Sequence, residues 1–225
     1  MPYVAHTLEV SDNEQLVVNT RQLDCTTLVE TVTALKLCND RGQRTWADYV
    51  RMLTMLRYRQ GVLDGYPSRL HYFSDWIRDK VQMQLVNDIQ QPNPPFSAVQ
   101  TVNVNYMSTH PEAYKALKAN AALVPLIRQQ EQSLSGLKAR YIPKSAVRNT
   151  KLLRSVIKDG DIIAITCNKA GLDIAHLGFA VWRKDGLHLL NASMLHKKVV
   201  EEPMTLYRYL QKHKTFTGIR ILRIQ

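Results

Sequence analysis

The sequence contains few cysteines and no metal-binding motif. Its three cysteines are Cys25, Cys38 and Cys167, too few for a disulfide framework and without the paired spacing of a zinc site. A metal amidase would need two or three converging ligands, and no His-Glu-x-x-His or equivalent spacing occurs. The sequence therefore predicts no metal site and no cofactor, and it leaves at least one thiol unpaired.

Long apolar runs are also missing. No segment approaches the length of a membrane span, and the first residues, MPYVAHTLEV, contain neither a basic leader nor an apolar stretch. We therefore expect a soluble polypeptide without a membrane span. A signal peptide that had been removed would leave no trace in this sequence.

Acidic residues are scarce relative to basic ones. Lys and Arg number 30 against 19 Asp and Glu, a formal charge of +11, which favours anionic partners such as nucleic acid, acidic lipid or an acidic polymer. The basic residues are scattered and come without an aromatic ladder or a nucleic-acid motif, so we expect no specific nucleic-acid binding. With 45% hydrophobic residues in a chain of 225, one folded unit can bury a substantial core.

Hydrophobic periodicity predicts helices in the first part of the chain. Apolar residues recur at helical spacing from Cys25 onward, Asp24 is a possible N-cap, and Thr27 and Glu30 form a box-like pair. This pattern places Cys25 in the first turn of a helix. Similar spacing predicts further helices at about residues 46–56, 70–81 and 111–135.

Alternating residues predict strands, mostly in the second half. Residues 98–106 alternate after the helix-breaking stretch QQPNPPF. Helices first and a strand meander afterwards imply an α+β fold with an antiparallel sheet. The meander is predicted from strands at residues 161–167, 175–182, 187–193, 197–202 and 218–224, with a short helix at 206–213.

Cys25 is the candidate nucleophile. A thiol reacts as its thiolate, and a helix N-terminus lowers the pKa of a thiol because the backbone N–H groups and the macrodipole favour the anion. The alternative for Cys25 is a small buried core residue. The histidine and asparagine that accompany it favour a catalytic role.

His176 and Asn191 complete a possible catalytic set. Gly178 and Ala180 share the strand face of His176, which would leave room for another chain or a substrate. Asn191 lies on the next predicted strand, and antiparallel pairing could bring it beside His176. Cys, His and Asn would then supply a thiolate, a general base and acid, and a side chain that fixes the imidazole tautomer. As a single residue, Asn191 fits a turn equally well.

Three motifs, in this order, resemble those of the NlpC-type cell-wall cysteine hydrolases on the papain-like fold. LDCTTLVE is similar to their Asp-Cys-Ser/Thr helix start, AHLGFA to their His-Val-Gly-Ile strand, and LLNASM to the strand of their third polar residue. PYVAHTLE resembles the Pro-Tyr entry of that domain, and SRLHYFSDWI resembles a segment of the N-acetylmuramoyl-L-alanine amidase-like branch. The chain departs from the family in the long stretch between Cys25 and His176 and in having Asn191 where many relatives carry histidine.

The resemblance implies a single papain-like catalytic domain over residues 1–225. Its helical N-terminal part would pack on a C-terminal antiparallel sheet or partly open barrel. Residues 41–150 would form a large helical elaboration, between the nucleophile helix and the catalytic sheet, that shapes the substrate groove. The resemblance also implies a periplasmic or secreted location, with the signal peptide absent from this chain.

The same resemblance implies an amidase mechanism on muropeptides. Cys25 would attack the amide carbonyl, His176 would protonate the leaving amine and then activate water, and Asn191 would orient His176. The backbone N–H of Cys25 and the hydroxyl of Tyr3 would contribute to the oxyanion hole. The preferred bond is the lactyl–L-Ala amide, and the alternative is a bond farther along the stem peptide.

The branch motif implies Arg69, Tyr72, Asp75 and Trp76 as substrate-binding residues. Arg69 could bind a muropeptide carboxylate bidentately, whereas a solvated arginine at a helix start is the commoner case. Trp76 fits a packed helix aromatic equally well. The other histidines lack a partner motif and are expected to be structural or solvated: His6, His71, His110, His188, His196 and His213.

Two further functions compete with this interpretation. One is a basic domain that binds glycan or nucleic acid and retains Cys25 incidentally. The other is a papain-like peptidase or acyltransferase that acts on protein substrates. The sequence predicts no particular oligomeric state.

Overall fold

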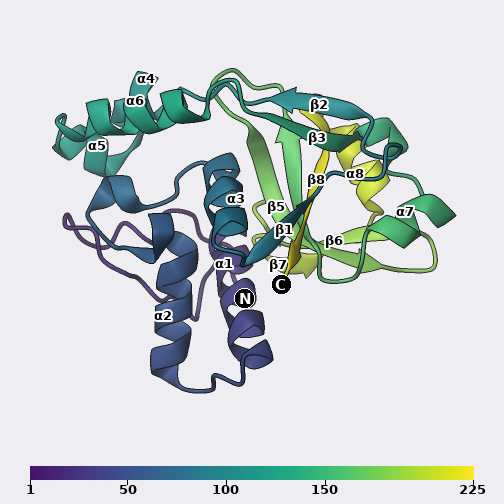
Figure 1. Cartoon of the computed structure of the whole chain (residues 1–225), viewed down its shortest axis with the longest axis horizontal. Helices are drawn as coiled ribbons and strands as arrows, with labels where there is room; N and C mark the ends of the chain where they lie inside the picture. Colours follow the sequence, from purple (N-terminus) through teal and green to yellow (C-terminus); the bar gives the residue numbers. More distant parts are fainter.

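The computed structural model describes residues 1–225 and has the α+β organisation expected from the sequence, with an antiparallel sheet (Figure 1). The α-helices are α1 (Cys25–Asp40), α2 (Trp46–Arg57), α3 (Phe73–Gln82), α4 (Tyr106–Thr109), α5 (Lys115–Ala119), α6 (Leu123–Leu134), α7 (Lys151–Val156) and α8 (Leu206–Lys212). The strands are β1 (Val86–Ile89), β2 (Ala98–Thr101), β3 (Lys138–Pro143), β4 (Ile162–Cys167), β5 (Ile174–Trp182), β6 (Leu187–Ser193), β7 (Lys198–Glu201) and β8 (Phe216–Ile224).

The sheet joins strands from both halves of the chain. Its order is β2-β3-β8-β4-β5-β6-β7, and β1 pairs with β8 outside this path. The predicted meander is present as β4 to β7, while the last strand, β8, lies between β3 and β4. Residues 41–150 accordingly contain three strands of the sheet, β1, β2 and β3, as well as helices α2 to α6.

Several elements differ from the sequence prediction, and the helix predicted for residues 111–135 is divided into α5 and α6. Strands β1 and β3 and helix α7 were not predicted, because each is short and lacks a clear apolar period. The strand predicted for residues 98–106 ends at Thr101. Val102 and Val104 are buried in a separate apolar cluster beneath α4 and α6, and Val104 makes only an isolated bridge to Gly171. The alternation there reflects burial rather than continued strand pairing.

Helix α1 begins as predicted at Asp24, but its capping box uses a different partner. The Asp24 carboxylate accepts from the Thr27 N–H at 2.8 Å, and the Thr27 hydroxyl accepts from the Asp24 N–H at 2.9 Å. Glu30, predicted to pair with Thr27, is buried and accepts from Arg57 Nε at 2.8 Å. The box fixes the first turn that carries Cys25, and Glu30 fastens α1 to α2.

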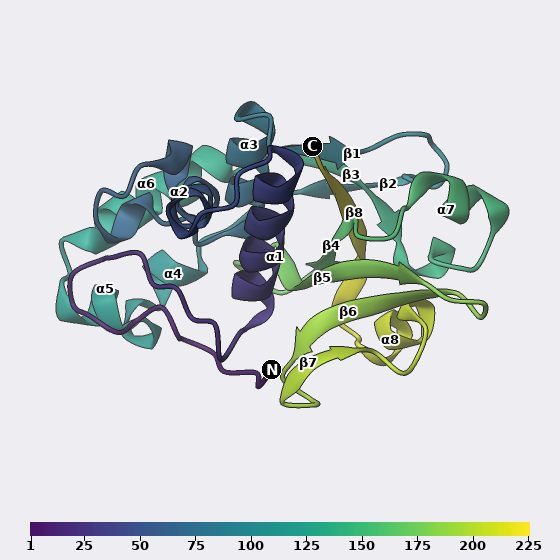
Figure 2. The same ribbon diagram turned by 90° about the horizontal axis from the view of Figure 1, so that it is seen from below.

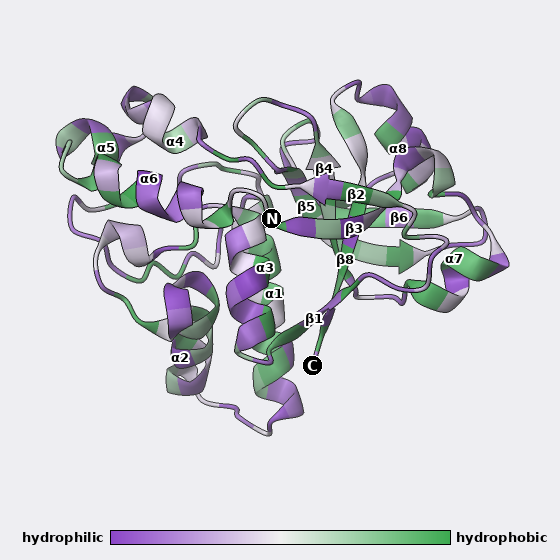
Figure 3. Ribbon diagram, turned by 45° about the horizontal axis from the view of Figure 1, so that its top comes forward, coloured by the Kyte–Doolittle hydropathy of each residue, from purple (hydrophilic) through white to green (hydrophobic).

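Apolar clusters cover both faces of the sheet. Helix α1 packs on the face that presents Leu177 and Phe179 of β5, whereas α8 packs with Ala180 and Leu189 on the other face. Figure 2 shows α1 and α8 on opposite sides of β5 and β6. In Figure 3 the strands around β5 and β6 carry many hydrophobic residues. Helices α2 and α6 alternate between hydrophobic and hydrophilic positions in the same view. None of the helices is long and apolar enough to cross a membrane.

Candidate active site

Cys25 is the first residue of α1, directly after its N-cap. Its backbone N–H donates to no acceptor within the chain, as expected for the first turn of a helix. The side chain is half-buried and packs beside the main core. The thiol and a free backbone donor are thus held together at one helix end.

His176 and Asn191 come together across neighbouring strands. Phe179 of β5 pairs with Leu190 of β6, and the same register continued by one residue sets Asn191 opposite Gly178. Asn191 is then a diagonal neighbour of His176 on one face of the sheet. The contact is a hydrogen bond of 2.8 Å between His176 Nε2 and Asn191 Oδ1, so the predicted juxtaposition is present and the turn alternative for Asn191 is wrong.

The surroundings of Asn191 fix the orientation of its amide. Its Nδ2 donates to the carbonyls of Leu189 and Val200 at 3.4 and 3.3 Å and to Glu202 Oε1 at 3.2 Å. Because all three partners are acceptors, the amide oxygen must face His176. His176 therefore carries its proton on Nε2, and Nδ1 remains as the unprotonated nitrogen.

The space expected beside Gly178 is occupied. A Cβ at this position would lie 2.6 Å from the Leu190 carbonyl oxygen and 2.7 Å from Leu189 Cδ1, and Ala180 is buried in the second core cluster. The prediction that these small residues leave room for a substrate is wrong. They admit the Leu189 side chain and the close approach of β6, which brings Asn191 to His176.

A hollow of about 590 Å³ is lined by both Cys25 and His176. Cys25 and His176 line it together with Asp173, and its remaining wall comes from other parts of the chain. The additional lining side chains that sequence reasoning missed are His71, Phe73, Met107 and Tyr114. His71 and Phe73 stand in the SRLHYFSDWI segment, which could have pointed to them, whereas Met107 and Tyr114 lie in segments without a distinctive motif.

Burial shifts the pKa values of Cys25 and His176 in opposite directions. It raises the pKa of Cys25 to about 11, with a further contribution from the Asp24 charge, and hydrogen bonds from Thr26 and the Leu177 backbone offset this only in part. Burial also lowers the pKa of His176, against smaller opposing effects of Asn191, Glu202 and Asp24. The expectation of a lowered thiol pKa is wrong: desolvation outweighs the helix N-terminus, and the resting pair is a neutral thiol with a neutral imidazole.

Tyr3 lies next to the nucleophile. Its backbone bridges to Leu23, two residues before Cys25, and its N–H donates to the Lys197 carbonyl at 3.0 Å. Burial, and then the nearby Cys25 and Asp24, raise the pKa of the Tyr3 phenol. The hydroxyl therefore stays protonated and can donate a hydrogen bond near the thiol.

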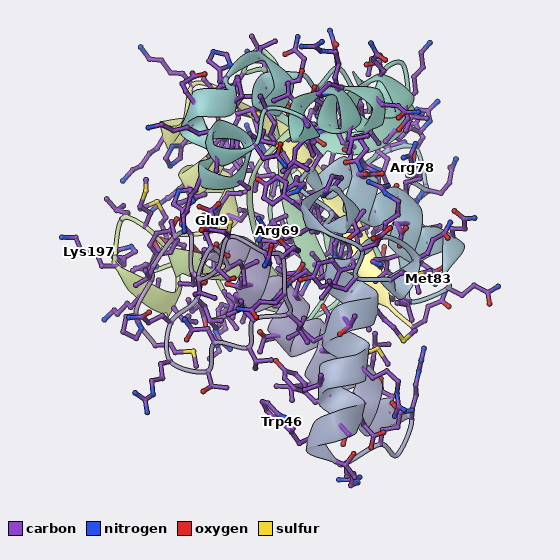
Figure 4. The ribbon with its side chains drawn as sticks, turned by 90° about the vertical axis from the view of Figure 1, so that its left-hand side faces the viewer. Glu9, Trp46, Arg69, Arg78, Met83 and Lys197 are labelled. Carbon is purple, nitrogen blue, oxygen red and sulfur yellow. The ribbon has the colours of Figure 1, made fainter.

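Arg69 lines a neighbouring hollow rather than the one at Cys25. This hollow, of about 760 Å³, is bordered by Arg69, Glu9 and Glu14, and Figure 4 shows the labelled Arg69 and Glu9 close together. Arg69 is buried, with a nitrogen 3.7 Å from Glu14 Oε1. The ring of Tyr66 lines the same hollow and packs at a tilt against the ring of His71, with 4.4 Å between the ring centroids. His71 in turn borders the Cys25 hollow.

The other three residues of the branch motif have structural partners. The Tyr72 ring lines the Cys25 hollow, but its hydroxyl donates to Glu131 at 2.7 Å. Asp75 is buried between Arg59 and Arg78, each at 2.7 Å. Trp76 is fully buried and stacks on Phe73 at 4.8 Å. Asp75 and Trp76 thus shape α3 and do not line the hollow.

No group of three or more His, Cys, Asp or Glu side chains is arranged to hold a metal ion. The side chains that line the hollow supply a thiol, an imidazole and apolar walls. This arrangement can perform nucleophilic attack on a carbonyl, followed by proton transfer through the imidazole.

The family comparison and the comparison with solved structures both find N-acetylmuramoyl-L-alanine amidase or amidase-like proteins. The model of the AmiA-like family, described as N-acetylmuramoyl-L-alanine amidase-like, matches residues 1–219. No curated protein is significantly similar in sequence. Among solved structures, a Bacteroides fragilis protein described as a candidate xylanase is 43% identical, with a TM-score of 0.92 over 99% of this chain and 96% of that one.

Two further solved structures are similar. An N-acetylmuramoyl-L-alanine amidase from Bacteroides uniformis ATCC 8492 is 41% identical, with a TM-score of 0.92 over 100% of this chain and 92% of that one. A protein from Legionella pneumophila shares the fold at 24% identity, with a TM-score of 0.74 over 99% of this chain and 84% of that one.

Proposed function

Because the chain belongs to the AmiA-like family of N-acetylmuramoyl-L-alanine amidase-like proteins, we propose that it is a cysteine amidase of peptidoglycan fragments. Its substrate is a muropeptide, and the bond cleaved is the amide between the lactyl group of N-acetylmuramic acid and L-Ala. The observation that carries the cysteine mechanism is the hollow shared by Cys25 and His176, with Asn191 bonded to the imidazole.

The first half-reaction forms a thioester. His176 Nδ1 takes the proton of the Cys25 thiol as Sγ attacks the amide carbonyl, and the carbonyl oxygen becomes an oxyanion. The backbone N–H of Cys25 and the hydroxyl of Tyr3 are the donors available to this oxygen. The intermediate then breaks its C–N bond, and the imidazolium gives its proton to the leaving amine of the stem peptide.

The second half-reaction releases the muramoyl product. The neutral His176 takes a proton from water as the water oxygen attacks the thioester carbonyl. Breaking of the C–S bond restores the Cys25 thiol with the proton from His176 and leaves a lactyl carboxylic acid. Asn191 holds the imidazole in one tautomer throughout.

The fold and location are part of the same proposal. A cysteine at a helix start, followed by a histidine and an asparagine on adjacent antiparallel strands, resembles the NlpC-type papain-like arrangement described above and supports that fold as part of the proposal. In a single domain over residues 1–225, residues 41–150 contribute Tyr72, Phe73, Met107 and Tyr114 to the Cys25 hollow, in agreement with a role in shaping the groove. A cell-wall substrate implies a periplasmic or secreted enzyme.

Glycoside hydrolysis fits this hollow less well. It requires a pair of carboxyl groups on either side of the scissile bond. The hollow at Cys25 contains one carboxylate, Asp173, and its two oxygens accept from the backbone N–H groups of Ser74 and Ile174 at 3.1 and 2.8 Å. Asp173 therefore organises the backbone, and the thiol and imidazole remain as the reactive groups.

Digestion of purified disaccharide muropeptides, followed by mass spectrometry, tests the function. We expect a stem peptide with a free L-Ala amine and a disaccharide that keeps its lactyl carboxylic acid. A shortened stem still attached to muramic acid would instead identify a stem-peptide endopeptidase. Muropeptides that remain intact after prolonged incubation would contradict hydrolysis and favour a binding domain.

A further inference from the structure

A buried carboxylate lies directly behind the catalytic asparagine. Glu202 follows β7, and its side chain has no exposed surface. Oε1 accepts from Asn191 Nδ2 at 3.2 Å, and Oε2 lies 3.2 Å from Nε2 of His196. Its backbone is held as well, since its N–H donates to the Leu189 carbonyl at 2.9 Å and its carbonyl contacts His188 Nδ1 at 2.8 Å.

We propose that Glu202 is a positioning residue for the amidase reaction, which fixes the Asn191 amide and stabilises His176 when the imidazole becomes protonated. This inference deepens the proposed function and rests on it. Glu202 touches neither the thiol nor the substrate hollow, so it acts through Asn191. Burying a carboxylate without a full cationic partner costs free energy. A positioning role accounts for the presence of a buried carboxylate at Glu202.

The acceptors around Asn191 determine which way its amide is oriented. If the amide were reversed, its oxygen would face Glu202 and two backbone carbonyls, and its nitrogen would face His176 Nε2. Glu202 carries the only charge among these acceptors, and hydrogen bonds to a carboxylate are about twice as strong as neutral ones. Glu202 therefore provides the largest single preference for the orientation that keeps Nδ1 of His176 free to accept the thiol proton.

Charged and titratable groups surround His176 and Glu202 and affect whether His176 is protonated. The Asp24 and Glu202 carboxylates favour protonated His176, whereas burial opposes it, and protonated His213 would also oppose it. The titratable groups around His176 and Glu202 are Asp24 and Cys25 at the start of α1, His188 from β6, His196 from the turn before β7, Tyr209 from α8 and His213 after α8.

His196 is the neighbour of Glu202 that carries a positive charge when its imidazole is protonated. Its imidazole is 32% exposed and contacts the second Glu202 oxygen. When His196 is protonated it partly neutralises Glu202 and so weakens the support that Glu202 gives to protonated His176. Changing Glu202 and changing His196 should therefore move the titration of His176 in opposite directions.

The test is an NMR titration of the His176 ring in the full-length chain, with the His176 signal assigned by its loss in a His176→Ala variant. In Glu202→Gln, which keeps the size of the side chain and removes its charge, we expect the His176 midpoint to move about one pH unit lower. In His196→Gln, where Glu202 cannot be neutralised by a protonated imidazole, we expect the midpoint to move higher.

Glu201→Gln is the matched control. It removes the same charge one residue earlier, but that carboxylate is directed to Arg183, at 2.7 and 2.6 Å. The His176 midpoint should stay at the wild-type value in this variant. Equal shifts in the Glu201 and Glu202 variants would show only a general field effect and would overturn the proposal.

The titration needs no substrate, so its failure and that of the proposed function are distinguishable. An unchanged His176 midpoint in Glu202→Gln would overturn the positioning role even if muropeptides are cleaved. If Glu202→Gln does not fold, the His196 variant decides, and an unchanged midpoint there overturns the proposal. In an active enzyme, the low-pH limb of kcat/KM should follow the NMR midpoints, with the plateau in Glu202→Gln reduced about three- to tenfold.

Discussion

Oδ1 of Asn191 lies 2.8 Å from Nε2 of His176, and the two residues come from adjacent antiparallel strands. The amide nitrogen of Asn191 donates to two backbone carbonyls and to the Glu202 carboxylate, so the amide oxygen is the atom that faces His176. Because Nε2 is committed to Asn191, Nδ1 is the nitrogen that can exchange a proton with the thiol. The pairing of β5 with β6 thus sets the tautomer of His176 that the proposed mechanism uses.

Asn191→Ala removes the acceptor for His176 and leaves Glu202 without its amide donor. We expect kcat to fall about 10²-fold, because the imidazole loses its orientation, and stability to fall by about 1–3 kcal/mol, because a buried carboxylate loses a partner. Kinetics on a muropeptide and urea denaturation measure the two effects. Unchanged kcat in a folded variant would remove Asn191 from the mechanism.

Cys25 in the free enzyme should react slowly with iodoacetamide at neutral pH. Burial raises the pKa of the thiol to about 11, so the alkylation rate should rise with pH well beyond 9. The same shift affects stability, since the folded chain favours the protonated thiol: the contribution is complete below the ordinary pKa of 9.0 and is lost as pH rises through about 11. Mass spectrometry of labelled peptides follows the rate, and a rate that levels off near pH 7 would contradict this assignment.

The low-pH limb of kcat/KM should lie below the ordinary pKa of histidine. Burial lowers the pKa of His176 from 6.5, so the imidazole stays neutral and able to accept the thiol proton as the pH falls through 6.5. Activity should be lost only at the lower pH where the buried ring becomes protonated. A pH profile on a muropeptide measures the midpoint, and a value above 6.5 would show that negative neighbours outweigh burial.

Glu30→Gln should destabilise the fold strongly. Glu30 and Arg57 form an ion pair with side chains only 2% and 3% exposed, and removing one partner leaves a buried charge, at a cost of about 3–5 kcal/mol. The control is Asp40→Asn in the exposed pair with Lys36 on the same helix, where the expected loss of stability is much smaller because solvent screens the pair. Chemical denaturation compares the two, and equal losses would refute the structural role of the buried pair.

The sequence predicted the parts of the fold that have strong local signals. The N-cap at Asp24 follows from capping chemistry, and the meander of β4 to β7 and the placement of Asn191 beside His176 follow from alternation. Strands β1 and β3 are different, because they are held by pairing with β8 at the end of the chain. No local pattern contains that long-range information.

The site was predictable to a similar extent. Cys25, His176 and Asn191 stand in motifs, and their side chains are near one another in the fold. Arg69 and Asp75 were implied by one contiguous motif, yet neighbouring carboxylates and guanidinium groups hold them away from the Cys25 hollow. The raised pKa of Cys25 was also missed, since desolvation depends on what covers the helix start rather than on the helix start itself.

The role of Glu202 has no sequence signal of its own. It is one of two adjacent glutamates, and Glu201 forms an exposed ion pair with Arg183 while Glu202 is buried against Asn191. The backbone at the end of β7 buries the Glu202 side chain and leaves the Glu201 side chain partly exposed. Site-directed variants of the two residues are therefore more informative together than either is alone.

Muropeptide turnover by Cys25→Ala, followed by mass spectrometry, is the most direct test of the cysteine mechanism. Wild type and Cys38→Ala are measured in parallel. Cys38 is a buried thiol on the same helix, in the core, and serves as the matched control. We predict that wild type and Cys38→Ala release the stem peptide and that folded Cys25→Ala releases none above the uncatalysed rate. Release of the stem peptide by Cys25→Ala at the wild-type rate would contradict the cysteine mechanism.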